Sequence, residues 1–127
     1  GAKNISFMRD NSNTKYIMLG KTFIGYHHGN TKIDDLPLVF ATSSDSSMNF
    51  GLARFREVHT GDKHYYMTKE LRGVRMVQIP SMVDPDNWTN DSMFLNGIRA
   101  GLAFCYHPEK GKCAEFEGRV LINNKKN

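Results

Sequence analysis

The feature that most limits what this chain can fold into is a series of short segments, rich in aromatic and β-branched residues, that are joined in pairs by glycine-containing turns. Three such pairs occur: residues 15–19 with 21–28, residues 65–71 with 74–80, and residues 98–107 with 113–122. Segments of this composition on either side of a tight turn are typical of β-hairpins. A further segment, residues 52–60, alternates apolar and polar side chains and predicts a single strand.

One stretch between these strands follows a helical period instead. The apolar side chains that fall on one helix face are Ile33, Leu36, Val39 and Phe40. Asp34 or Asp35 can cap this helix, and Pro37 then falls in the first turn, where its missing N–H costs little. We therefore interpret the two aspartates as helix caps and not as catalytic acids.

The order of these elements predicts the fold class. Strands, a helix and then strands in hairpin pairs indicate an α+β fold with a mostly antiparallel β-sheet and one or two helices. Residues 1–127 are expected to form a single domain, which is large enough to bury one core.

Charge and apolar content narrow the class of protein. The net charge is +4 and much of the excess lies in the terminal NNKKN, so the charge is compatible with a phosphate-bearing partner without indicating one. No apolar run approaches the roughly 20 residues of a membrane span. The amino-terminal GAKNISFMRD has no signal-peptide core. We therefore expect a cytoplasmic protein with no membrane partner.

Cys105 and Cys113 flank the turn expected at residues 107–111. They either bridge across the hairpin or remain reduced and packed, as in a cytosolic protein. Neither belongs to a Cys-x-x-Cys motif, so a thiolate zinc site is not expected.

Two polar clusters each follow or end a predicted strand: YHHGN at residues 26–30 and HTGDKH at residues 59–64. Loops at strand ends often carry functional side chains because a rigid sheet positions them. Imidazole and carboxylate groups together suit Zn, Mn or Fe. The same residue types are common in turns and at hydrogen-bonded strand ends, so the clusters alone do not decide between a metal site and a structural role.

Four blocks in a fixed order add a resemblance that covers roughly residues 15–122. The blocks are GKTFIGYHHGNTKIDDLPLVFA, ARFREVHTGDKHYY, GVRMVQIPSMVDPDNW and GLAFCYHPEKG. Together they resemble the C-terminal half of a calcineurin-like metallophosphoesterase, closest to the phage-type branch. The resemblance implies half of a four-layer αββα sandwich and a site that uses divalent metal ions, Mn, Zn or Fe.

The resemblance also implies metal ligands. His28 matches a lone histidine that binds the second metal, and His64 matches the last histidine of a Gly-His-x-His motif that binds the first metal. Asp62 stands where that motif has its first histidine, and an oxygen ligand there changes the charge and geometry of the site. Asp62 either binds metal or only closes a turn.

Further residues are expected around these ligands. Asn30 stands where the branch usually has aspartate, and His27 is expected to be a neighbour of the ligands or a packing residue. His59 either supports His64 or only ends a strand. Trp88 either lines the substrate cleft or anchors the core.

The family's first three metal motifs, Asp-x-His, Gly-Asp-x-x-Asp and Gly-Asn-His, do not occur in residues 1–27. No catalytic residue is therefore assigned to this chain, and its metal site is expected to be incomplete. The resemblance implies the C-terminal part of a hydrolase that uses metal-activated water on phosphate mono- or diesters, including nucleic acid, and that needs a separate N-terminal half. The alternative is a catalytically inactive binding or assembly module, a homo-oligomer for example. The expected location is the cytoplasm of a bacterium or of a phage-infected bacterial cell.

Overall fold

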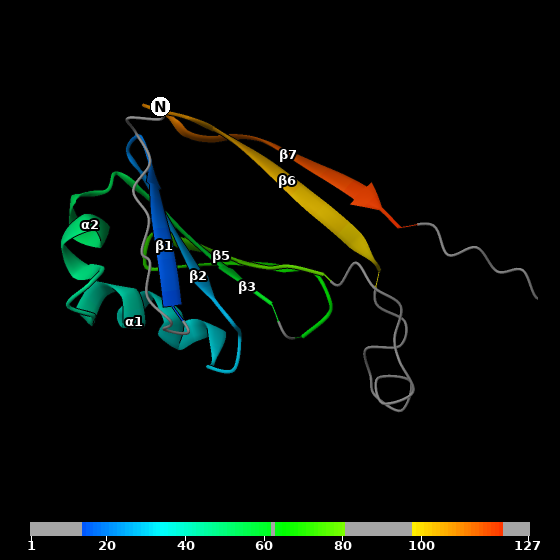
Figure 1. Ribbon diagram of the computed structural model, residues 1–127, viewed down its shortest axis with the longest axis horizontal. Coiled ribbons are helices and arrows are strands. Elements are labelled where there is room, and N and C mark those ends of the chain that lie inside the picture. Colours follow the sequence, from blue (N-terminus) through cyan, green and yellow to red (C-terminus); the bar gives the residue numbers. More distant parts are fainter. Residues whose placement is uncertain (1–13, 62, 81–97, 121–127) are drawn as a thin grey trace, which may run out of the picture.

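The computed structural model describes residues 14–61, 63–80 and 98–120. Within these residues the chain forms a five-stranded sheet, a separate two-stranded sheet and two short α-helices. Figure 1 shows how these elements are arranged. This arrangement confirms the α+β class. None of the described helices is long and apolar enough to cross a bilayer.

Each hairpin expected from the sequence is present. In chain order the elements are β1 (Thr14–Leu19), β2 (Thr22–His27), the 3-10 turn η1 (Ile33–Asp35), α1 (Leu36–Thr42), α2 (Ser47–Leu52), β3 (Phe55–Thr60), β4 (Met67–Leu71), β5 (Val74–Gln78), β6 (Ala100–His107) and β7 (Gly111–Arg119). The hairpins are β1 with β2, β4 with β5, and β6 with β7.

The five-stranded sheet is mixed, with strand order β1-β2-β3-β5-β4. Its outer pairs are the antiparallel hairpins that the sequence predicts. Its central pairs, β2 with β3 and β3 with β5, are parallel. The antiparallel pairing expected from the sequence therefore holds for the hairpins and is wrong for the centre of the sheet. The sequence did not indicate the parallel pairs, because a parallel pair needs a long crossover that leaves no local turn signal.

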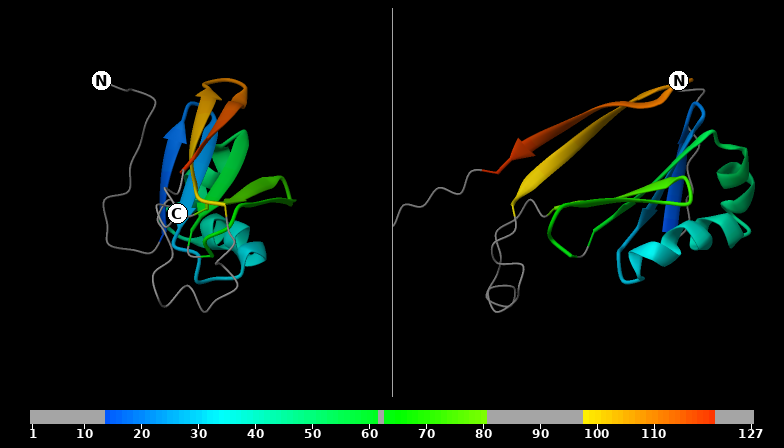
Figure 2. Two further views of the ribbon diagram at one scale, coloured as in Figure 1. Left: turned by 90° about the vertical axis from the view of Figure 1, so that its right-hand side faces the viewer. Right: turned by 180° about the vertical axis from the view of Figure 1, so that it is seen from behind.

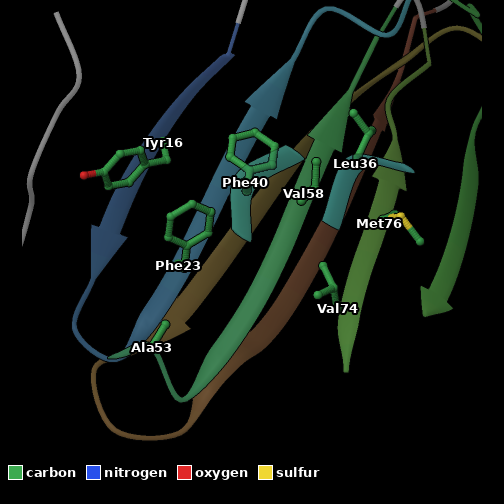
Figure 3. Packing of buried hydrophobic residues seen from close by; sticks show 8 residues of the cluster. All are labelled: Tyr16, Phe23, Leu36, Phe40, Ala53, Val58, Val74 and Met76. Atoms are coloured by element: carbon green, nitrogen blue, oxygen red, sulfur yellow. The ribbon is translucent and has the colours of Figure 1, made fainter. Parts of the chain in front are cut away.

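The crossover from β2 to β3 carries both helices, which cover one face of the sheet (Figures 1 and 2). Phe23 of β2 is fully buried there and stacks on Tyr16 with 4.9 Å between ring centroids. Its ring also meets Phe40 of α1 and Phe50 of α2 edge to face, at 5.6 and 5.3 Å. Each such pair contributes about 0.5–1.5 kcal/mol beyond area burial. Figure 3 shows how this core extends across the sheet through Leu36, Val58, Val74 and Met76.

Helix α1 begins where the sequence predicts, but the two aspartates before it do not cap it with their side chains. Pro37 lies in the first turn and Asp35 occupies the N-cap position, but the Asp35 side chain makes no capping hydrogen bond. Asp34 lies in η1 and pairs with Lys69 of β4, with 2.5 Å between Oδ1 and Nζ. Asp34 therefore ties the crossover to the edge strand of the sheet.

The β6–β7 hairpin lies across the other face of the sheet and extends beyond it (Figures 1 and 2). At its turn, the Lys21 N–H donates to the Pro108 carbonyl at 2.9 Å, and the Lys21 ammonium pairs with Glu109 at 2.7 Å. A Cβ added to Gly20, whose φ is 57°, would lie 2.4 Å from the Pro108 carbonyl oxygen. Gly20 therefore permits the close approach that fixes one end of the hairpin to the sheet.

Cys105 and Cys113 are free thiols on this hairpin, so the bridge that the sequence allows is absent. A register shift between Cys105 and Tyr106 places Cys113 outside the regular pairs, and its Sγ donates to the Cys105 carbonyl at 3.4 Å. The expectation that the thiols are packed is wrong, since both are exposed. Phe104 and Tyr106 face the five-stranded sheet, and strand alternation turns Cys105 the other way.

Helix α1 rests on the backbone of β2 at Gly25. An added Cβ there would lie 2.7–2.9 Å from three atoms of the Phe40 ring, closer than real Cβ atoms approach. Replacing Gly25 with alanine should therefore lower the free energy of unfolding by about 1–3 kcal/mol, measured by urea denaturation, because the methyl group overpacks the core.

Gly51→Ala is the matched control for this substitution. Gly51 lies in α2 and nothing lies within 4 Å of an added Cβ. We expect no loss there, and a gain of up to about 1 kcal/mol from helix propensity. Equal losses at the two positions would contradict the close packing of α1 on the sheet.

Candidate functional site

The carboxyl ends of the three parallel strands meet at one edge of the sheet. β2 and β3 run in register with His27 opposite Thr60, so the loops that follow them begin as neighbours. A Cβ added to Gly61 would lie 3.7 Å from the His28 carbonyl oxygen. β5 ends beside them, with Gln78 opposite Thr60. The two polar clusters of the sequence therefore lie at the same edge.

His28 and His64 belong to these two neighbouring loops. His28 is exposed directly after β2, and His64 is half-buried in the loop after β3. His64 has a φ of 62°, in the left-handed region that a residue with a side chain adopts only with strain. Strained backbone of this kind is concentrated at functional sites. The fold thus places both histidines on adjacent loops, and their joint binding of a metal stays a prediction.

A cleft of about 330 Å³ lies between the two loops and the end of β5. The loop after β2 contributes Asn30 and Lys32 to its lining, and the loop after β3 contributes Lys63 and Tyr65. Gln78 lines the β5 side, and its Nε2 donates to the Tyr65 carbonyl at 3.0 Å. Asn30, expected near the site from the sequence, is therefore part of a cleft that carries two lysines.

His27 is buried next to this cleft and holds the loop after β2. Its Nδ1 accepts a hydrogen bond from the Gly29 N–H at 3.0 Å, so that nitrogen carries a lone pair and not a proton. Burial lowers the pKa of His27, and the neighbouring His28 lowers it further. His27 is therefore neutral near pH 7 and fixes the turn that presents His28.

His59 points to the other face of the sheet, towards the hairpin. Its Nε2 lies 3.1 Å from Oε1 of buried Glu57, and its ring lies against Phe104 with 4.6 Å between centroids. His59 is the penultimate residue of β3, so the expected strand-end position holds, and its support of His64 stays a prediction. The imidazole contributes to the docking of the hairpin on the sheet.

The Glu57 carboxylate joins the two sheets. Its Oε1 also accepts a hydrogen bond from the Tyr106 hydroxyl at 3.0 Å. Burial raises the pKa of Glu57, but the hydrogen bonds from His59 and Tyr106 and the nearby positive charges outweigh it, so the pKa lies below its usual value. Burial and the Glu57 charge raise the pKa of Tyr106, so its hydroxyl remains protonated and donates.

The described residues do not by themselves form a metal site. Among residues 14–61, 63–80 and 98–120, no group of three or more His, Cys, Asp or Glu side chains gathers closely enough to bind a metal ion. Asp62 and Trp88, both expected at the site, lie outside the described residues. His28 and His64 alone do not fit Zn, Mn or Fe, since such ions take about four or more ligands.

Sequence reasoning missed the positive lining of the cleft and the buried carboxylate beside His59. A signal existed for each. Lys63 directly precedes His64 and Lys32 follows the first cluster, so loops that present the histidines present these lysines too. Alternation along a strand places Glu57 and His59 on the same face, which predicts that they meet.

Tyr106→Phe removes one of the two side-chain hydrogen bonds to the Glu57 carboxylate. We expect the free energy of unfolding at pH 7, measured in urea, to fall by about 1–3 kcal/mol. Because the folded pKa of Glu57 lies below its unfolded value of 4.5, its contribution is present above that pH and is lost as the pH falls through the folded pKa. The deficit of the variant should therefore shrink in acid.

Tyr66→Phe is the control for this variant, since its exposed hydroxyl donates to exposed Glu115 at 3.3 Å. We expect it to cost less than about 0.5 kcal/mol. A cost as large as that of Tyr106→Phe, or a deficit independent of pH, would contradict the role of the buried carboxylate.

His64→Gly and His64→Ala remove the same imidazole but differ in backbone freedom. Glycine relieves the left-handed strain that alanine retains, so the glycine variant should be more stable by about 1 kcal/mol in urea denaturation. His28, which has no positive φ, serves as the control, and there glycine should be no more stable than alanine. The same order at both positions would mean that His64 is not strained.

No family model and no curated protein matches this chain. Among solved structures, the crystal structure of a single mutant of Vps29 from Entamoeba histolytica is similar, with 14% sequence identity and a TM-score of 0.45. The similarity covers 93% of this chain and 61% of that chain. A likeness of this extent establishes neither a family nor an activity for this chain.

Proposed function

We propose that this chain is the C-terminal part of a cytoplasmic, metal-dependent phosphoesterase of the phage-type branch that hydrolyses phosphate mono- or diesters. The remaining metal ligands would be Asp62 and residues outside this sequence, on a longer chain or on a separate one. The observation that carries the proposal is the parallel pairing of β2 with β3, which sets the loops of His28 and His64 side by side.

The position of these loops suits a ligand site. In open sheets with parallel strands, ligands bind in crevices outside the carboxyl ends of the strands, because the sheet holds the start of each loop rigidly. The bond from the Gly29 N–H to His27 adds a further restraint on the loop that carries His28. His28 and His64 therefore have the setting that two ligands from different segments require.

The charge near these histidines suits a phosphate ester. Lys32 and Lys63 both line the neighbouring cleft, and Asp34, two residues after Lys32, is paired with Lys69. A cationic cleft raises the local concentration of anionic substrate and lowers the cost of bringing its charge to the protein. The lysines would therefore bind substrate while the histidines contribute to the metal shell.

The described residues supply at most two metal ligands, which is too few for a complete metal site. This chain alone should bind Mn or Zn weakly and should not hydrolyse phosphate esters. The alternative, an inactive binding or assembly module, also lacks activity but gives His28 and His64 no shared role. Metal binding by histidine variants therefore distinguishes the two.

The test measures Zn²⁺ and Mn²⁺ binding by equilibrium dialysis for the wild type and for His28→Ala, His64→Ala and His107→Ala. His107 is the matched control, because it is exposed on the β6–β7 turn, where its Nδ1 accepts the Glu109 N–H. We expect each of the first two variants to lose at least about tenfold in affinity and the control to lose none. Equal effects at all three positions would contradict the proposal.

The second arm measures hydrolysis of bis(p-nitrophenyl) phosphate with Mn²⁺. This chain is mixed with a polypeptide that carries the family's Asp-x-His, Gly-Asp-x-x-Asp and Gly-Asn-His motifs. We expect activity only in the mixture, and its loss with His28→Ala or His64→Ala. A mixture that neither binds metal nor hydrolyses the ester would overturn the proposal.

A further inference from the structure

The charged side chains in the described lining of the cleft beside the two histidines are both lysines. Lys32 and Lys63 approach it from different loops, and the described lining includes no aspartate or glutamate. Neither lysine takes part in an ion pair within the described part of the chain, whereas Lys21, Lys69 and Lys112 do. Both lysines therefore contribute positive charge to the cleft.

The remainder of the lining is neutral and partly apolar. Tyr65 is 41% exposed, so its ring is accessible, and Ile33 and Met67 lie in the same cleft. Asn30 supplies an exposed amide group that can recognise polar atoms of a ring. The volume of about 330 Å³ lies at the lower end of the range for small-molecule sites, about 300–1,000 Å³.

A ligand that matches this lining needs an anionic group at one end and a flat, polar ring at the other. Lysine binds phosphate as a compact charge with several donors, and aromatic side chains stack on nucleobases irrespective of the base. We propose that the cleft binds one nucleoside monophosphate unit, with the phosphate between Lys32 and Lys63 and the base against Tyr65. This inference rests on the proposed function and names its substrate group, but the binding itself needs no metal.

The test is a titration of the chain with AMP in EDTA, followed by isothermal calorimetry or by NMR. We expect saturable binding with a Kd no weaker than about 1 mM. Lys32→Gln and Lys63→Gln should each weaken it by about fivefold. Lys110→Gln makes the same change of charge at the exposed β6–β7 turn and should leave the affinity unchanged.

The base is tested separately from the phosphate. Tyr65→Leu should lower the affinity for AMP by at least about fivefold while the affinity for inorganic phosphate stays constant, since only the base contacts the ring. Adenosine should bind more weakly than AMP to the wild type. Thermal denaturation of each variant checks that the fold is kept, and the Lys32 and Lys63 variants then provide a second measure if the Tyr65 variant is unfolded.

A free nucleotide and the end of a nucleic acid strand present the same chemistry. A 5′-phosphorylated oligonucleotide that competes with AMP, where the unphosphorylated strand does not, identifies the strand end as the source. Competition by neither strand identifies the free nucleotide. Either outcome supports a nucleotide site.

Two results would overturn the inference: no saturable binding of AMP in EDTA, or an equal loss of affinity with Lys110→Gln, which would indicate a general charge effect. Neither result depends on the hydrolysis assay. Binding of AMP without metal-dependent activity in the mixture would support the nucleotide site and contradict the phosphoesterase. Metal-dependent activity without binding of AMP would support the phosphoesterase and contradict the nucleotide site.

Discussion

The parallel contact between β2 and β3 is the constraint on which the rest of the structure depends. It forces the chain to cross over one face of the sheet, and the two helices of that crossover supply half of the aromatic core. The Phe40 ring resting on Gly25 closes this layer. The same register places the ends of β2 and β3 together, so the packing that stabilises the fold also brings the two histidine loops to one edge.

The other face of the sheet is organised by a buried charge. Glu57 is kept ionised by His59 and Tyr106, and the three side chains join β3 to the hairpin. A buried carboxylate with its hydrogen bonds satisfied specifies where the hairpin docks, because a shifted hairpin would leave the charge unpaired. Glu57 and His59 thus meet the hairpin on one face of β3, whereas the candidate site lies beyond the end of that strand.

The local parts of the fold followed from the sequence and the non-local parts did not. Gly20 and Gly73 marked tight turns, and Pro37 marked the start of a helix, because each signal acts over a few residues. The parallel pairing gave no such signal. The clusters around His28 and His64 were visible as residue types, whereas the cleft between them depends on which strands are neighbours. The resemblance supplied roles for these histidines that neither composition nor spacing could assign.

The proposed metal position shared by His28 and His64 is tested most directly by paramagnetic broadening with Mn²⁺. Histidine ring signals are followed by NMR as Mn²⁺ is added in substoichiometric amounts, with His107 on the distant hairpin turn as the internal reference. If the two histidines share a metal position, their rings broaden together and first, while the ring of His107 stays sharp. Broadening of only one of the two rings, or of His107 to the same degree, would contradict it.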